Sequence, residues 1–137
     1  LCYVDSQDKK FALFNCGHTE CYLTVKDNGK YKVAPLPAKL PPLGMGAASH
    51  ELSNQDKKLY YGFSIKEGFH LNLYSDGLPD MKDPSGERFE EERTKKFFTE
   101  LYSVPQEKLN DHISQTVASW CAEARLPDDV TLIDIRF

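Results

Sequence analysis

Long apolar runs are absent from this sequence, and no basic and apolar leader opens it. A membrane-spanning helix needs about 20 consecutive apolar residues, and a secretory signal needs a charged and then apolar N-terminal stretch. Hydrophobic residues make up 40% of the 137 residues and charged residues 28%, as in an ordinary soluble domain. We therefore expect a single core, no membrane segment and a cytoplasmic location.

Basic clusters are scarce as well. The chain has 17 Lys and Arg residues against 21 Asp and Glu residues, which gives a net charge of −4 and a pI of about 5.5. The pairs at residues 57–58 and 95–96 are the short exceptions, and they are typical of solvated faces. Because nucleic-acid binding needs clustered Lys and Arg, we expect no nucleic-acid partner.

Cysteine is limited to Cys2, Cys16, Cys21 and Cys121. Without a secretory leader, we expect these to be free and mostly buried thiols. Cys16, His18 and Cys21 lie close enough in sequence to raise a zinc hypothesis, but their spacing fits no common zinc pattern. We favour a turn at residues 16–18 and keep a small zinc-binding domain as an alternative.

The most informative stretch is residues 69–77. Apolar positions alternate there with polar ones, a period of two that predicts a strand with one apolar and one polar face. The apolar set is Phe69, Leu71, Leu73 and Ser75, and the other set is His70, Asn72, Tyr74 and Asp76. Asp76 ends the polar face and Gly77 follows it. A carboxylate on a sheet rim suits Mg²⁺ or Mn²⁺, although Asp-Gly by itself more often indicates a turn.

Similar alternation predicts further strands at residues 1–5, 11–15, 21–25, 31–36 and 58–65. Asp27-Asn28-Gly29 predicts a hairpin turn, because Asn and Gly accept positive φ. The Pro- and Gly-rich residues 35–46 predict a loop. Since the first strand starts at the first residue, we expect the chain to be cut from a longer protein.

After residue 80 the pattern changes to a helical period. A helix is predicted over residues 88–102, followed by a second helix with Ser103 as its cap and Pro105 in its first turn. The buried stripe expected for the second helix is Leu109, Ile113, Val117, Trp120 and Ala124. A last strand is predicted over residues 130–135. Because several strands are joined by hairpins, the fold class is α+β with mostly antiparallel sheets and two helices near the C-terminus.

A second acid, Asp128, stands at the entrance of that last strand. It could meet Asp76 at one sheet rim, although spacing alone does not require this. As a bare pattern, Pro127-Asp128-Asp129 is also a good helix stop and a solvated turn. Both interpretations stay open at the level of residue types.

Five short motifs follow one another along nearly all of the chain. They are Asn-Cys-Gly-His at residues 15–18, Pro-Leu-Gly-Met at 42–45, Leu-Tyr-Ser-Asp-Gly-Leu-Pro-Asp at 73–80, Gly-Glu-Arg-Phe at 86–89 with Glu-Arg at 92–93, and Asp-Asp-Val-Thr-Leu-Ile at 128–133. This order resembles the metal-dependent protein phosphatase (PPM, protein phosphatase 2C-like) family. The likeness is greatest to its bacterial branch, typified by the stage II sporulation phosphatase and the phosphatases that regulate stress sigma factors.

The resemblance implies an α-β-β-α sandwich and hydrolysis of phosphoserine or phosphothreonine with two Mn²⁺ or Mg²⁺ ions. Asp76 and Asp128 would then be metal ligands and, through the metal, catalytic. Asp129 would turn away to hydrogen-bond the backbone, Thr131 would pack in the sheet and His18 would be structural. Three positions depart from the family pattern without removing a ligand: Cys16 for Ala, Asp80 for Glu, and Glu90 where a Gly often follows the Phe.

The family's first acidic motif, Asp-x-x-Gly-x-Gly, does not precede residue 15. The resemblance therefore makes residues 1–137 the C-terminal part of one PPM-type domain, which by itself would have little or no activity. We expect its parent to act on a bacterial regulatory phosphoprotein. Open sheet edges also predict a possible homodimer. The alternative is a non-catalytic, phosphatase-like module that binds a partner protein.

Overall fold

The computed structural model describes residues 1–45, 59–122 and 124–137, which form two antiparallel sheets and a group of helices. One sheet has the strand order β1-β2-β5 and the other has the order β4-β3-β6-β7. The first consists of β1 (Cys2–Asp5), β2 (Lys10–Leu13) and β5 (Tyr61–Ser64). The second consists of β3 (Cys21–Asp27), β4 (Lys30–Leu36), β6 (His70–Tyr74) and β7 (Leu132–Arg136).

The tight turn between β3 and β4 is set locally. Asn28 and Gly29 have φ values of +50° and +78°, and two successive left-handed residues match the twist of a hairpin. This confirms the turn predicted from Asp27-Asn28-Gly29. The remaining neighbours in the second sheet, β3 with β6 and β6 with β7, are distant in sequence and pair only because of the tertiary fold.

An apolar core lies between the two sheets. Phe11 and Leu13 of β2 meet Leu23 of β3 and Leu71 of β6 there, and all four are buried. Phe11 also stacks on Phe137, with ring centroids 5.4 Å apart. Burial of the inward faces of both sheets is the main term that holds them together.

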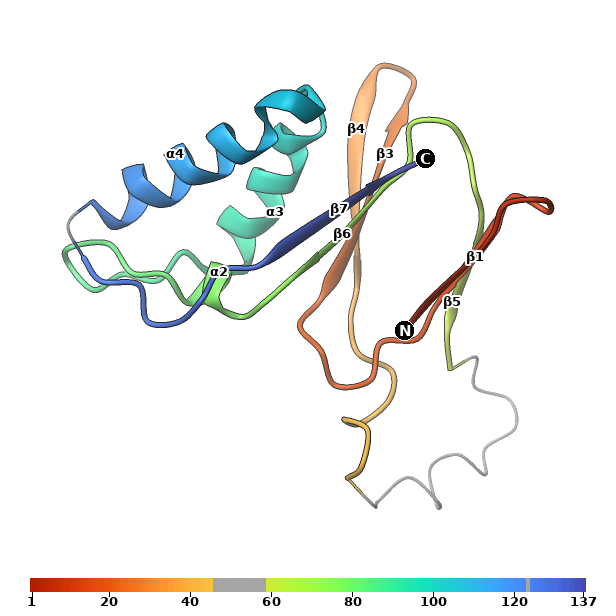
Figure 1. The fold of residues 1–137 in the computed structure, drawn as a ribbon, viewed down its shortest axis with the longest axis horizontal. Helices are drawn as coiled ribbons and strands as arrows, with labels where there is room; N and C mark the ends of the chain where they lie inside the picture. The colour runs from red at the N-terminus through yellow and green to blue at the C-terminus, as the bar shows by residue number, and fades with distance from the viewer. Residues whose placement is uncertain (46–58, 123) are drawn as a thin grey trace.

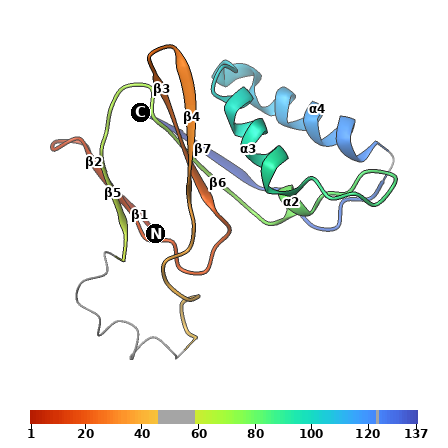
Figure 2. The same ribbon diagram turned by 180° about the vertical axis from the view of Figure 1, so that it is seen from behind.

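Helices cover the other face of the second sheet. They are α2 (Gly77–Asp80), α3 (Glu90–Leu101), the 3₁₀ helix η1 (Gln106–Lys108) and α4 (Leu109–Cys121). Phe98 of α3 packs on Tyr22 and Tyr74 of the sheet, with centroid distances of 5.4 and 5.3 Å. The layers are therefore helices, second sheet and first sheet, as Figures 1 and 2 show from opposite sides.

The α+β class is confirmed, and the described residues supply three of the four layers expected for the sandwich. Most of the strands are shorter than predicted. Residues 46–58 lie outside the described residues, and they include residue 58 of the expected fifth strand and residue 46 of the expected loop. Among the described residues, no helix is both long and apolar enough to span a membrane.

The face of β6 predicted to be polar is in fact covered. Asn72 is 1% exposed, and His70 and Tyr74 are also buried. The polar residue types predicted for this face are present, but the face is covered because α3 packs on the second sheet, which leaves β6 with a packed layer on both sides. The alternation of residue types does not show what covers a face. Here the polar side chain of Asn72 bonds to Thr24 and Asp134 beneath the helices.

The second helix also starts and ends at other residues than predicted. Ser103 does not cap it, since its hydroxyl donates to the Tyr31 hydroxyl at 3.0 Å, and η1 intervenes before α4 begins. Ala122 has a φ of +47°, which ends α4 before Ala124. The chain breaks the helical path at Ala122 because L-residues in the left-handed region cannot continue a right-handed helix.

Candidate functional site

Asp76 lies two residues beyond the end of β6 and is exposed. The chain turns at Asp76, as Asp-Gly indicates, and the Leu78 N–H donates to the Ser75 carbonyl at 3.2 Å across residues 75–78. With a φ of −60° and a ψ of −20°, Asp76 then leads directly into α2. A short helix therefore follows the strand directly and presents the Asp76 carboxylate at the edge of the second sheet.

Gly77 is required by a close approach of two chain segments. A Cβ built on Gly77 would lie in severe contact with the Asp129 carbonyl oxygen, 2.9 Å from the Asp129 carbonyl carbon and 3.4 Å from the Asp128 carbonyl oxygen. Backbone atoms cannot yield to it as a flexible side chain could. The segment that carries Asp128 thus runs directly against the residue that follows Asp76.

Ser75 joins the same two segments by hydrogen bonds. Its backbone N–H donates to the Thr131 carbonyl at 3.0 Å, and its hydroxyl donates to the Asp129 carbonyl at 2.9 Å. The Thr131 N–H donates in turn to the Ser75 hydroxyl oxygen at 3.0 Å. Because these bonds tie the end of β6 to the entrance of β7, the structure brings the segments of Asp76 and Asp128 to one sheet edge.

Two detailed expectations at this edge change. The Asp129 contact at the strand entrance is made by its backbone carbonyl, whereas the carboxylate that bonds backbone is that of Asp128, which accepts from the Asp129 N–H at 2.7 Å. Thr131 is exposed and does not pack in the sheet. Thr131 lies outside the sheet because β7 begins only at Leu132.

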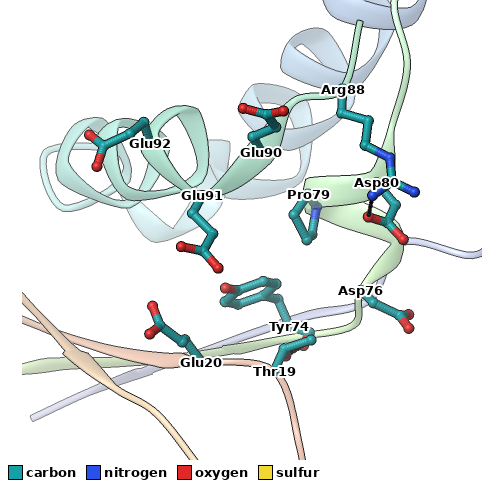
Figure 3. A pocket seen from close by; sticks show the side chains of 10 residues that line it. All are labelled: Thr19, Glu20, Tyr74, Asp76, Pro79, Asp80, Arg88, Glu90, Glu91 and Glu92. Atoms are coloured by element: carbon teal, nitrogen blue, oxygen red, sulfur yellow. Dashed lines mark hydrogen bonds and ion pairs between the residues drawn. The ribbon is translucent and has the colours of Figure 1, made fainter. Parts of the chain in front are cut away.

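An acidic cleft of about 540 Å³ opens beside Asp76 (Figure 3). Its lining residues are Thr19, Glu20, Tyr74, Asp76, Pro79, Asp80, Arg88, Glu90, Glu91 and Glu92. Arg88 is the single basic residue among them, and its guanidinium lies 3.5 Å from the Asp80 carboxylate. Burial raises the pKa of the Tyr74 phenol, so Tyr74 remains neutral at the base of the cleft.

The upstream motifs also reach this edge. A Cβ on Gly17 would press into the Pro42 ring, which shows that the turn at residues 15–18 and the Pro-Leu-Gly loop are in contact. The Asn15 side-chain amide donates to the Thr19 and Leu36 carbonyls at 3.0 and 3.1 Å. The Thr19 hydroxyl donates to the Tyr74 carbonyl at 2.7 Å, which fixes the turn to the end of β6.

The Gly-Glu-Arg-Phe and Glu-Arg motifs have a structural role that the sequence did not reveal. Arg93 pairs with Glu87, and its guanidinium carbon lies 4.6 Å from the centre of the Trp120 ring. The Trp120 indole N–H donates to the Met81 carbonyl at 3.3 Å, and the Phe89 N–H donates to the same carbonyl at 2.8 Å. Arg93 and Trp120 therefore fasten the loop between α2 and α3, which borders the cleft. The sequence signal for Arg93 was the Glu-Arg motif, and that for Trp120 was its place in the predicted apolar stripe of the second helix.

Metal-ligand chemistry is limited in the described part of the chain. No group of three or more His, Cys, Asp or Glu residues placed to hold an ion occurs there. The zinc alternative is therefore not assembled: the His18 ring nitrogen contacts the Thr19 hydroxyl, and burial raises the pKa of the Cys21 thiol to about 11. Two exposed carboxylates at one edge are oxygen donors of the class that Mn²⁺ and Mg²⁺ prefer.

A two-sheet fold with this edge and these helices is that of the PP2C-type phosphatase domains. The chain belongs to the stage II sporulation protein E (SpoIIE) family, whose model matches residues 1–137. None of the curated proteins matches the sequence significantly.

Solved structures share the fold at low identity. The SiaA PP2C domain of Pseudomonas aeruginosa has 20% identity and a TM-score of 0.76 over 99% of this chain and 49% of its own. The PP2C domain of Bacillus subtilis SpoIIE, with a fragment of its regulatory domain, has 19% identity and a TM-score of 0.61. The match covers 98% of this chain and 36% of that structure. The structure of the RsbU and RsbW domains of a Mycobacterium tuberculosis protein has 21% identity and a TM-score of 0.61. The match covers 97% of this chain and 34% of that structure. The chain therefore spans about half or less of each of these structures.

Proposed function

We propose that residues 1–137 are the C-terminal part of a metal-dependent phosphoserine/phosphothreonine phosphatase domain, in which Asp76 and Asp128 hold Mn²⁺ or Mg²⁺. The observation that carries the proposal is the approach of the Asp128–Asp129 backbone to Gly77, which supports a site shared by Asp76 and Asp128. Membership of the SpoIIE family and the PP2C fold support it. The substrate would be a regulatory phosphoprotein, in line with the RsbU and SpoIIE neighbours.

When bound, such an ion lowers the pKa of a coordinated water and neutralises phosphoryl charge. The contribution of this chain is to present oxygen donors at a fixed edge. The Asp128 carboxylate is oriented by its bond from the Asp129 N–H, and Asp76 by its place between β6 and α2. The fixed geometry matters because in-line attack on phosphorus depends on alignment.

A Mn²⁺ titration followed by paramagnetic broadening of backbone amide signals tests this assignment. We expect selective broadening around Asp76 and Asp128 in the wild-type chain, and a loss of it in both Asp76→Asn and Asp128→Asn. The variant Asp5→Asn, on the first sheet, serves as the matched control and should leave the broadening unchanged. Broadening that is equal in all four proteins would refute the proposed site.

We further propose that two carboxylates bind the ion too weakly for turnover by this chain alone. No phosphate release from a phosphoserine peptide is expected at millimolar Mn²⁺. Mn²⁺-dependent release that Asp76→Asn abolishes would contradict that expectation.

The second candidate is a non-catalytic, phosphatase-like module that binds a protein partner. The observation in its favour is that no third ligand joins Asp76 and Asp128 among the described residues. The titration separates the two functions, since a module of this kind needs no metal at the edge of β6 and β7.

A further inference from the structure

A buried polar network lies under the helices at the end of β6 and β7 away from Asp76. Its centre is the Asp134 carboxylate, whose side chain is 0% exposed. That carboxylate accepts hydrogen bonds from the Asn72 amide at 2.9 Å and from Arg136 Nε at 2.7 Å, and it lies 3.5 Å from His70 Nδ1. The last strand, Leu132–Arg136, therefore carries two charged residues, Asp134 and Arg136, between apolar ones.

The network spans most of the second sheet. Asn72 also accepts from the Thr24 hydroxyl of β3, at 3.4 Å. Arg136 donates through a second nitrogen to the Val104 carbonyl in the connection between α3 and α4, at 3.0 Å. Three strands and one helix connection are thus linked through Asn72 and Arg136, the two hydrogen-bond partners of Asp134.

The contacts across β6 and β7 depend on one register. Asn72 stands directly opposite Asp134, and His70 stands directly opposite Arg136. In antiparallel strands a slip by one residue turns every side chain to the other face of the sheet. Such a slip would turn the Asp134 carboxylate toward the apolar core between the two sheets, away from its hydrogen-bond partners. A buried, unpaired charge of this kind is strongly destabilising.

Charge pairing here outweighs burial. Burial alone would raise the pKa of Asp134, but the hydrogen bonds from His70 and Arg136 lower it below its usual value. The carboxylate is therefore ionised at neutral pH. Buried ionic groups often add little net stability, and their best-attested use is to specify one arrangement over its alternatives.

The register of β6 against β7 also decides where the two acids lie. β6 leads into Asp76, β7 follows Asp128, and Ser75 bonds to Thr131 between them. We propose that Asp134 is a positioning residue that fixes the register of β6 and β7 and thereby holds Asp76 and Asp128 at one edge. The register claim stands on the geometry above, and its relevance to metal binding rests on the proposed function.

Amide hydrogen exchange in the full 137-residue chain tests the register claim. In Asp134→Asn we expect the Ser75 and Thr131 amides to exchange at least about tenfold faster relative to the β3–β4 hairpin amides. Ile113→Ala, which shortens an α4 side chain packed on the helix-side core, is the control for a general loss of stability and should leave that ratio unchanged.

A ratio in Asp134→Asn within about twofold of the wild type would overturn the proposal. If that variant does not fold, Arg136→Gln is measured in the same way, because it removes the guanidinium and leaves the Asn72–Asp134 bond. The same two outcomes then apply to it.

Metal binding is read separately by adding Mn²⁺ to each variant. We expect Asp134→Asn to weaken the broadening at Asp76 and Asp128, with Asp27→Asn, an exposed carboxylate paired with Lys32, as the control. If the wild-type chain shows no broadening, the proposed metal site is wrong. The amide-exchange result still tests the register of β6 and β7, because it does not depend on metal.

Discussion

Replacing Gly77 by Ala tests the close approach on which the candidate site depends. The new methyl group would lie 2.9 Å from the Asp129 carbonyl carbon, and side-chain Cβ atoms essentially never come within 3.0 Å of another heavy atom. The backbone of residues 128–129 must therefore move away, or α2 must shift. Both movements disturb the hydrogen bonds between Ser75 and Thr131.

The magnitude follows from what overpacking costs in well-packed sites. Inserting a methylene-sized group where backbone must yield costs about 1–3 kcal/mol. Gly77 is not in the left-handed region, so no strain adds to this, and the propensity gain of Ala in a four-residue helix is small. At about 2.1 cal/mol/K of unfolding entropy per residue, each kcal/mol lowers the Tm of this chain by roughly 3–4 °C.

The assay is thermal unfolding followed by circular dichroism, together with amide exchange at Thr131. We expect Gly77→Ala to lower the Tm by about 3–10 °C and to speed exchange at Thr131. Gly86→Ala is the comparison, since Gly86 has a φ of +87° but no heavy atom within 4 Å of its built Cβ. It should cost backbone strain alone and leave Thr131 exchange as it is. A Gly77→Ala protein with wild-type Tm and wild-type exchange would refute the reasoning.

Three further predictions concern stability. Glu90 has a φ of +59°, a strained value that glycine adopts freely. Glu90→Gly should therefore raise the free energy of unfolding in urea by roughly 0.5–1 kcal/mol, whereas Glu91→Gly in the same helix should lower it by a similar amount. Equal changes of the same sign in both variants would show that Glu90→Gly relieves no strain. The folded pKa of Asp134 lies below its unfolded value, so its contribution is present above about pH 4 and is lost as pH falls through the folded pKa; urea melts between pH 6 and 2 should show this loss in the wild type and a flatter profile in Asp134→Asn. Arg93→Ala should lower the free energy of unfolding by about 1–2 kcal/mol because it removes an ion pair and a ring contact, and a loss no larger than that of the exposed Lys95→Ala would contradict this.

Local chemistry made several features predictable. The β3–β4 turn follows from Asn28 and Gly29, whose tolerance of positive φ is a property of the residues themselves. The change from a period of two to a period of 3.6 near residue 80 indicated a sheet followed by helices, and hence the α+β class. The ordered motifs indicated the PP2C-like family, which the family match confirms.

Other features depended on which surfaces meet. His70, Asn72 and Asp134 are polar residue types, which by themselves do not say whether a face is solvated, but the packing of the helical layer on the second sheet buries their side chains as one network. The pattern of residue types cannot distinguish a solvated polar face from a buried, mutually bonded one. That distinction requires knowledge of what covers the strand.

The sequence by itself determined the chain-order pattern of strands and helices, the β3–β4 hairpin and the family, because these rest on local propensities and on the order of motifs. Only the tertiary structure decided why Gly77 is glycine, what Arg93 holds and how Asp76 and Asp128 come to one edge. These depend on contacts between residues more than 20 positions apart in the chain. Such contacts are set by the burial of two sheet faces and a helical layer, which no local pattern records.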